Sequence, residues 1–542
     1  MEHVFVALPG GEDGTGSYEK TFLRDANGKK VREVLWGDWL TLAPDMPQTG
    51  EWRWIRWAWK DEAKRRLLKI RAREVADRRP LEMIFLDVGI GDGSILITPE
   101  RATDPALPPG QQERVIIVDA GKGRAMRDFL DARFGTYRAG MAFHAAVISH
   151  ADLDHYGGFR SILSTKDISF EHLYHNGALE LPTGEELEGM GGVTTPDADG
   201  IRYLAQIVES DAAARAIYDP VANPSGRAFA KLIATAIEKG NVGSFAMLST
   251  EHGSFAQGAR WMPGFAPGDR DGYTIEVLGP WVERDGAGKL RLRTFGDAAK
   301  TKNGHSVILR LRFGEFSILF GGDLNTESEQ FLLTRYAGLG SWPADPAGRD
   351  AMVAAARVRF RSDVMKACHH GASDVTDEFL SAVNPAAFVI SSGDDDVNYV
   401  HPRPDLLGRL GKAGRGAAPV LLSTELQRST REVEDAALVR RLKRNIDLLA
   451  VGGPETDENG APLSDAGRKA ACETLAKAMN ADVDTLGLPN ISVDGAIYVK
   501  TDGKRLIAAF KKETQDPNSK WFWYSYALKA DQTMDLVPRP EN

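Results

Sequence analysis

The chain has 542 residues, more than a single domain usually contains, so we expect one large domain with insertions or about two to three units. Hydrophobic residues make up 42% and charged residues 26%, which is typical of a soluble globular protein. The formal net charge of -9 argues mildly against a protein that mainly grips a nucleic-acid backbone, because such proteins are usually basic.

The cysteines and the lengths of the apolar runs indicate where in the cell the protein is expected. Cys368 and Cys472 lie far apart and form no CxxC pair, so we expect no disulfide framework and a reducing environment. No apolar run approaches about 18 residues, the length that a membrane-spanning helix needs. Residues 1–16 lack a basic region followed by an apolar one, so no signal peptide is expected. These features favour a cytoplasmic location without a membrane.

Residues 1–80 predict a small all-β module that resembles an SH3-like barrel in pattern. They hold six of the 11 tryptophans, and short apolar stretches alternate with turn residues. Residues 51–60 alternate large apolar side chains with arginine, which predicts a strand, and a change of phase between Trp54 and Trp57 indicates a bulge. We expect the tryptophans to fill the core or the contact with the next domain, although they could also stack single-stranded bases.

Residues 81–425 predict an α/β sandwich, because apolar strands alternate with helical segments. Residues 160–300 are long and poorly periodic, so we expect an insertion that covers the site as a lid. The predicted strands are 82–88, 94–98, 114–118, 145–149, 306–313, 315–320, 363–368 and 386–391. The predicted helices are 124–134, 201–218, 228–239 and 403–412.

Two further segments follow the sandwich. Residues 426–489 are charged and mostly helical, which predicts a helical insertion. Residues 490–542 are expected to supply closing strands and a C-terminal tail, with a hairpin about Asp502-Gly503.

The strongest motif is the segment SHADLDHYGG at residues 149–158. It places His150, Asp152, Asp154 and His155 directly after a buried strand. Residues two apart on an extended chain point the same way, so His150 and Asp152 can share one metal ion. After a turn, Asp154 and His155 can reach a second ion, and two ions can hold a bridging hydroxide as nucleophile. The alternative is a polar loop with a helix-capping aspartate, but such a loop rarely contains these four residues in this order.

This motif resembles the HxHxDH signature of metallo-β-lactamase-fold hydrolases, with Asp152 in place of the middle histidine. The variant is similar to the ComEC type, the hydrolase domain of the bacterial competence DNA channel, although no channel helices are present here. The resemblance covers residues 81–425 and 490–513 and implies an αββα sandwich. Further segments match in the same order: FLDVGIGD at 85–92, IVDAG at 117–121, NGHS at 303–306, GD at 322–323, HHGAS at 369–373, HP at 401–402 and DGAI at 494–497.

The resemblance implies roles for residues outside the motif. Asp323 would bridge the two metals, and His370 would be the histidine of the second metal. His369 is the alternative ligand, or an orienting residue. His305 stands where many relatives supply a histidine to the first metal. His401 is expected to contact the substrate or leaving group rather than a metal.

Other candidate residues have simpler expected roles. Asp119 is expected to support the ligand histidines by hydrogen bonding, whereas Asp87 and Asp92 are expected to be structural. Five histidines show no companion pattern and are expected to have no special function: His3, His144, His172, His175 and His252.

The leading functional hypothesis is a phosphodiesterase or nuclease with two divalent ions. An aspartate at position 152 makes the first site richer in oxygen, which favours Mn²⁺, while the imidazoles leave Zn²⁺ open. His401 or His305 would stabilise or protonate the leaving oxygen. One alternative is a hydrolase of a small ester, thioester or lactone, which the acidic charge slightly favours. Another is a partner-activated module that binds a protein through residues 1–80 or 426–489.

Overall fold

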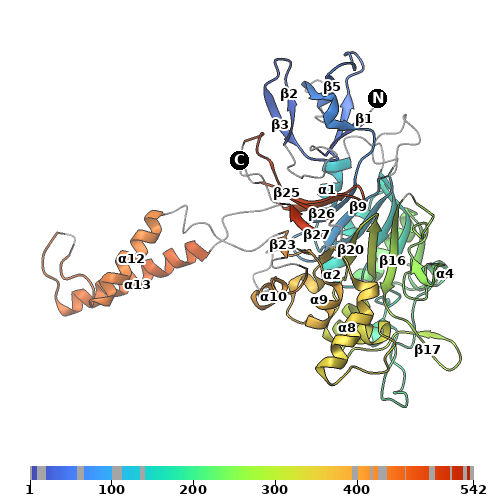
Figure 1. Ribbon diagram of the computed structural model, residues 1–542. Coiled ribbons are helices and arrows are strands. Elements are labelled where there is room, and N and C mark those ends of the chain that lie inside the picture. The colour runs from blue at the N-terminus through green and yellow to red at the C-terminus, as the bar shows by residue number, and fades with distance from the viewer. Residues whose placement is uncertain are drawn as a thin grey trace. The chain divides into compact units, whose positions relative to one another are not determined.

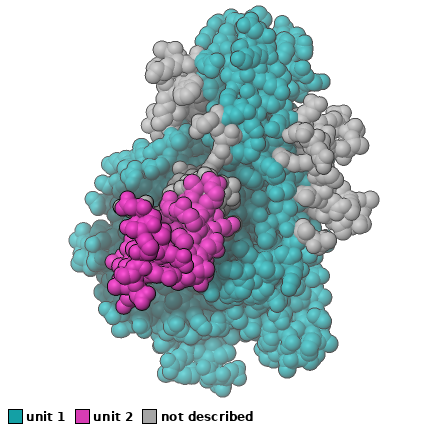
Figure 2. Space-filling model, turned by 90° about the vertical axis from the view of Figure 1, so that its left-hand side faces the viewer, with its two compact units in different colours: residues 1–425, 495–542 teal, residues 426–494 magenta. Residues whose placement is uncertain are grey.

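The computed structural model divides into two compact units, residues 1–425 with 495–542 and residues 426–494 (Figure 2). The residues described are 3–8, 20–57, 66–99, 113–134, 141–270, 272–393, 401–415, 419–424, 436–457, 459–487, 495–512, 516–528 and 534–537.

The N-terminal module is an all-antiparallel sheet, with strand order β3-β2-β6-β5-β4-β1-β7 in the described part of the chain. Its strands are β1 (His3–Val6), β2 (Thr21–Arg24), β3 (Lys30–Val34), β4 (Trp39–Leu42), β5 (Trp52–Trp57), β6 (Arg66–Arg71) and β7 (Val75–Ala76). The core of this sheet is aliphatic, as in Val6, Leu23 and Ile55. The prediction of a small all-β module is therefore confirmed at the level of an antiparallel sheet.

The tryptophans of β5 differ from the prediction. The strand pairs with β6 without a register shift, so the predicted bulge between Trp54 and Trp57 is wrong. Ile55 is fully buried, whereas Trp52 and Trp54 are half-buried on the opposite face of the strand, where Lys69 Nζ lies 4.7 Å and 5.6 Å from their ring centroids. The alternation is regular because Ile55 and Trp57 face the core, whereas Trp52 and Trp54 lie on the other face.

A mixed sheet of ten strands follows, in the order β13-β12-β11-β10-β9-β8-β24-β25-β26-β27 among the described residues. The pairs from β10 to β13 are parallel and the remaining pairs are antiparallel. The strands are β8 (Leu81–Leu86), β9 (Gly93–Ile97), β10 (Val115–Ala120), β11 (Met141–Val147), β12 (Ile168–His175), β13 (Val242–Met247), β24 (Ala496–Thr501), β25 (Leu506–Lys511), β26 (Trp521–Leu528) and β27 (Met534–Val537). The β24–β25 turn lies at residues 502–505, so the predicted C-terminal hairpin is confirmed.

A second mixed sheet has eight strands, in the order β14-β15-β16-β19-β20-β21-β22-β23 in the same described residues. Its pairs are antiparallel up to β20 and parallel from β20 to β23. The strands are β14 (Ser254–Ala256), β15 (Ala259–Trp261), β16 (Tyr273–Gly279), β19 (Ile308–Phe313), β20 (Phe316–Phe320), β21 (Val364–Lys366), β22 (Ala387–Ile390) and β23 (Val420–Ser423). A separate short ribbon joins β17 (Glu283–Arg284) and β18 (Leu290–Arg291).

The two mixed sheets pack face to face and helices cover their outer faces (Figure 1). Side chains of both sheets, such as Phe85 and Ile318, form the central core. One outer face packs against α1 (Ala125–Phe134), α3 (Phe159–Leu163), α4 (Asp211–Ile217) and α5 (Ala228–Lys239). The other packs against α7 (Thr326–Tyr336), α8 (Pro346–Phe360), α9 (Asp377–Val383) and α10 (Pro404–Leu410). Strands covered on both faces, such as β10, are apolar without alternation.

Residues 160–300 differ from the predicted insertion, because they supply β12 and β13 to the first sheet and β14 to β16 to the second. The predicted helix 228–239 is confirmed as α5. The predicted helix 201–218 is shorter: α4 begins only after Ser210, whose hydroxyl accepts from the Ala213 amide. Tyr203, which lies before it, forms a β-bridge with Arg293 instead.

The second unit contains two described helices, α12 (Ala436–Ala450) and α13 (Asp465–Gly487). Arg441 donates to Asp482 from Nε at 2.9 Å and from Nη2 at 2.5 Å, which joins the two helices. Nowhere in the described ranges is a helix both long and apolar enough to cross a bilayer.

Candidate metal centre

The motif at residues 149–158 lies where two parallel strands end. Val118 of β10 pairs with Val147 of β11, so the chain segments that follow these strands lie side by side. After β11 the chain passes His150 and enters the short helix α2 (Leu153–Tyr156). A Cβ at Gly158 would lie 2.0 Å from the Ala120 carbonyl oxygen, so only glycine allows this helix to approach β10.

The second sheet brings its own parallel strand ends to the same place. Asp323 follows β20, and His370 lies in the 3₁₀ turn Cys368–Gly371 that follows β21. Strands β20 and β21 are parallel neighbours, with Phe320 paired to Lys366. The two stacked sheets therefore deliver residues from four strand ends to one buried cluster.

Four buried residues of this cluster could hold a metal ion, namely Asp92, His155, Asp323 and His370. The Nε2 atoms of His155 and His370 lie 3.2 Å apart. Asp323 Oδ2 lies 3.1 Å from the first and 3.0 Å from the second. Asp154 Oδ2 lies 3.4 Å from His370 Nε2, so two nitrogens and two carboxylate oxygens converge.

The opposite nitrogen of each imidazole contacts a carboxylate. His155 Nδ1 lies 2.9 Å from Asp119 Oδ2, and His370 Nδ1 lies 2.9 Å from Asp92 Oδ1. Carboxylates and carbonyl oxygens only accept, so His155 Nδ1–H donates to Asp119 and His370 Nδ1–H donates to the Ser391 carbonyl oxygen, 3.3 Å away. In the neutral imidazoles each Nε2 then presents a lone pair to the cluster. The lone pairs of the neutral imidazoles and the two carboxylates repel one another unless protons on the imidazoles or a bound cation lie between them. The donor set therefore fits a divalent ion.

Asp92 is the residue of the group that the sequence interpretation treated as structural. Its Oδ1 lies 2.9 Å from His370 Nδ1, on the side away from the converging Nε2 atoms, and its other oxygen forms an ion pair with the buried Lys366. Its loop is pressed against α2, since a Cβ at Gly91 would lie 1.7 Å from the Asp154 carbonyl oxygen. By contrast, Asp87 accepts from the Gly89 amide at 2.9 Å, a turn contact of the expected structural kind. The glycines around Asp92 were the sequence feature that could have indicated this close approach.

The electrostatics of the cluster link its acids to its histidines. Burial raises the pKa of Asp323, but the charges of His155 and His370 outweigh burial and hold it well below its usual value. Burial likewise lowers the pKa of each histidine, and the neighbouring carboxylates, chiefly Asp323, raise it well above the usual value. Protons on the imidazoles thus balance the carboxylates, and a metal ion would compete with those protons.

His150 and Asp152 lie beside this group. The rings of His150 and His155 are 4.1 Å apart, and His150 Nε2 lies 3.6 Å from Asp152 Oδ2. Lys302, on α6 (Ala298–Gly304), forms an ion pair with Asp152 and lies 3.4 Å from Glu180 Oε1. Burial raises the pKa of Asp152, but His150 and then Lys302 lower it to about 2. The cation next to Asp152 is therefore an ammonium group of the chain itself.

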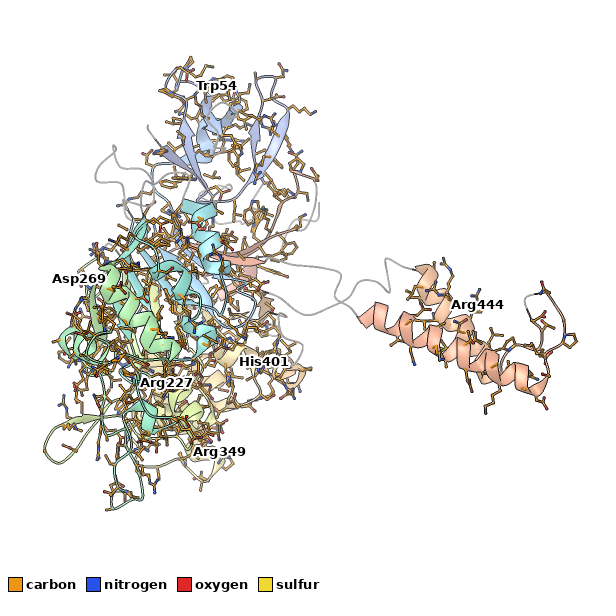
Figure 3. The ribbon with its side chains drawn as sticks, turned by 180° about the vertical axis from the view of Figure 1, so that it is seen from behind. Trp54, Arg227, Asp269, Arg349, His401 and Arg444 are labelled. Carbon is orange, nitrogen blue, oxygen red and sulfur yellow. The ribbon has the colours of Figure 1, made fainter. Side chains whose placement is uncertain are left out.

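The three remaining predicted histidines occupy different surroundings. His305 Nε2 donates to the Arg293 carbonyl oxygen at 2.6 Å, and burial lowers the pKa of His305 to about 4, so the structure does not bring it into the cluster. His369 Nδ1 lies 3.1 Å from Asp374 Oδ1, and its ring centroid is 6.1 Å from that of His370. The ring of His401 (Figure 3) lies 5.9 Å from that of His369, tilted by 36°, and His369 in turn is next to His370 of the cluster.

The expected support from Asp119 is confirmed. Besides its contact with His155, Asp119 Oδ1 accepts from the Ser149 amide at 2.8 Å, which ties β10 to the start of the motif. Neither a protein-family model nor a curated protein matches this sequence. The findings thus show an α/β protein with two mixed sheets and a buried Asp/His cluster that could hold a metal ion.

Proposed function

We propose that this chain is a metal-dependent hydrolase of the metallo-β-lactamase fold, acting on a phosphodiester such as a nucleic acid. The observation that carries the proposal is the convergence of His155 Nε2, His370 Nε2, Asp323 Oδ2 and Asp154 Oδ2 where two stacked sheets end. The layer order and the ordered motifs agree with the ComEC-type resemblance. A divalent ion at this point supplies Lewis-acid activation of a water molecule and of the bond to be cleaved.

The residues around the convergence point have separable tasks. Asp119 and Asp92 hold the two imidazoles in one tautomer and orientation. Lys302 places a positive charge at the Asp152 end of the cluster, where it can contact an anionic phosphoryl group. The rings of His369 and His401 offer hydrogen-bonding nitrogens to a substrate that enters beside His370.

A phosphodiester is favoured over an acyl ester by the donor set. Three aspartates, Asp152, Asp154 and Asp323, make the cluster rich in oxygen, which suits Mn²⁺ and similar hard ions that serve phosphoryl transfer. The second candidate, hydrolysis of a small ester or lactone, keeps the same residues and is favoured only by the net charge of -9.

The test uses full-length protein stripped of metal and resupplied with Mn²⁺ or Zn²⁺. Hydrolysis of labelled single- and double-stranded DNA and RNA is compared with hydrolysis of an acyl ester. We expect phosphodiester cleavage that needs the ion and that falls at least about 100-fold in Asp154→Ala. Asp128→Ala, an exposed aspartate on α1, is the matched control and should retain activity.

Two outcomes count against the proposal. Cleavage that persists in Asp154→Ala would contradict the assigned cluster. Ion-loaded protein that cleaves only the acyl ester would transfer the assignment to the second candidate.

A further inference from the structure

A second group of metal-binding side chains lies on two neighbouring strands of the ten-stranded sheet. It consists of His144 on β11 and of Glu171 and His172 on β12. One ligand atom of each residue lies within 4.8 Å of those of the other two. None of these residues belongs to the metal centre described above, and no companion pattern was predicted for His144 and His172.

The sequence brings the three residues together through a matched irregularity of both strands. On β11, Met141 and Phe143 face the helix-covered core, but the next residue to do so is Ala146. On β12, Phe170 faces this core and the next residue to do so is Leu173. Each strand therefore has an extra residue at the same level, because Phe143 pairs with Phe170 and Ala145 with His172. His144 lies at this irregularity on β11, and Glu171 and His172 lie at it on β12.

The hydrogen bonds of the two histidines leave one nitrogen of each ring without a partner among the described residues. The His144 side chain is only 7% exposed, yet its Nε2 has no hydrogen-bond partner among the described residues. Its Nδ1 lies 2.7 Å from Glu171 Oε2. His172 Nδ1 contacts Ser244 Oγ at 2.8 Å, which leaves His172 Nε2 for a further ligand. An ion held by His144, Glu171 and His172 together would take the place of the proton between His144 Nδ1 and Glu171 Oε2.

The group is also open to solvent on one side. The Glu171 side chain is 65% exposed, whereas the ring of Phe265 packs edge-on against His144 at 5.4 Å from the inside. An ion can therefore enter past Glu171. The positive charge of Arg114 acts on His144, and the negative charge of the Glu171 carboxylate opposes it. The remaining coordination positions would face water.

We propose that His144, Glu171 and His172 form a separate binding site for a transition-metal ion of the Zn²⁺ class. Two imidazole nitrogens and one carboxylate oxygen are a set that Zn²⁺, Ni²⁺ and Cu²⁺ bind, whereas Mg²⁺ and Ca²⁺ prefer oxygen alone. An ion there cross-links β11 to β12. Since β11 leads directly to His150, the ion would stiffen the strand that presents the metal centre.

The experiment counts ions and measures their affinity in the full-length protein, without any enzyme assay. Wild type, Glu171→Gln, His172→Gln and the double variant are loaded with Zn²⁺, freed of loose metal by a weak chelator, and analysed for bound zinc. The double variant should hold one ion fewer than wild type, and each single variant should bind that ion about 10- to 100-fold more weakly. Glu238→Gln, an exposed glutamate on α5, should behave like wild type.

A spectroscopic readout identifies the ligands. Cu²⁺ at this site should show coupling to two imidazole nitrogens in electron paramagnetic resonance, and to one fewer in His172→Gln. Equal ion counts and equal affinities in wild type and the double variant would overturn the proposal. Glu171 is exposed, so Glu171→Gln keeps the test decisive even if His172→Gln folds poorly. Failure of the hydrolase assay would leave this result unchanged.

Discussion

Asp119 holds the histidine at the centre of the cluster, and replacing it by asparagine changes only one atom. Its Oδ2 contacts His155 Nδ1 at 2.9 Å, and its Oδ1 accepts from the Ser149 amide at 2.8 Å. An asparagine can keep only one of these two acceptor contacts. The backbone of Asp119 has φ of 55°, a left-handed conformation that asparagine tolerates as well as aspartate does. The fold should therefore survive the change.

The expected loss in metal affinity follows from this geometry. If the carboxamide oxygen stays with the Ser149 amide, its nitrogen faces His155 Nδ1, and the imidazole proton is driven to Nε2. That proton then points at Asp323 Oδ2, 3.1 Å away, where the ion has to bind. Loss of such an orienting partner weakens metal binding by about 10- to 100-fold, or about 1.4–2.8 kcal/mol.

Isothermal titration calorimetry measures the affinity of metal-free wild type and Asp119→Asn for Mn²⁺ and Zn²⁺. Asp87→Asn is the matched control, since Asp87 follows β8 of the same sheet and accepts from the Gly89 amide. Thermal unfolding shows whether both variants remain folded. Unchanged affinity in folded Asp119→Asn would refute the argument that a carboxylate fixes the tautomer of His155.

Three further predictions address packing, pH and the internal cation. Gly158→Ala should destabilise the protein by about 2–4 kcal/mol in denaturant unfolding, while Gly123→Ala, which has open space, should not. Folding lowers the pKa of Asp152 from 3.8 to about 2, so its contribution to the free energy of unfolding is present above pH 3.8 and is lost as the pH falls towards 2. In acid unfolding, Asp152→Asn should therefore lose less stability over this pH range than wild type. Lys302→Met removes the ammonium group from Asp152 and should strengthen binding of an additional ion there, measured by elemental analysis; an unchanged ion count would contradict this role.

The local part of the site was predictable because one short segment carries it. The order of residues in SHADLDHYGG encodes a strand end, a turn and a short helix within ten positions, and these local features indicate a metal site. Asp323 and His370 were predicted as partners from the ordered motifs that carry the resemblance, and each follows a predicted strand. Asp92 was not, since its position depends on how closely the Gly91 loop packs on Asp154, which is a tertiary contact.

The orientation of His305 illustrates a second limit. The family resemblance implied that His305 could bind the first metal, but its Nε2 donates to the Arg293 carbonyl oxygen. That acceptor belongs to a segment 12 residues earlier whose path is set by the β-bridge between Tyr203 and Arg293. No local pattern encodes such a contact.

Strand β12 shows why residues 160–300 were taken for an insertion. Its sequence, ISFEHLYH, changes phase at Glu171 and His172, so neither half gives a full alternating pattern. The strand forms because β11 has the same irregularity at His144 and because β13 pairs on its other side. The change of phase that prevented prediction of this strand also brings together the residues of the proposed second metal site.

The most direct test of the metal centre is a crystal structure of the protein with Mn²⁺, using anomalous scattering to locate the ion. We expect an anomalous peak within coordination distance of His155 Nε2, His370 Nε2 and Asp323 Oδ2, at about 2.0–2.3 Å. Fully occupied Mn²⁺ elsewhere, with no peak among these three atoms, would contradict the central claim that they converge to bind a cation.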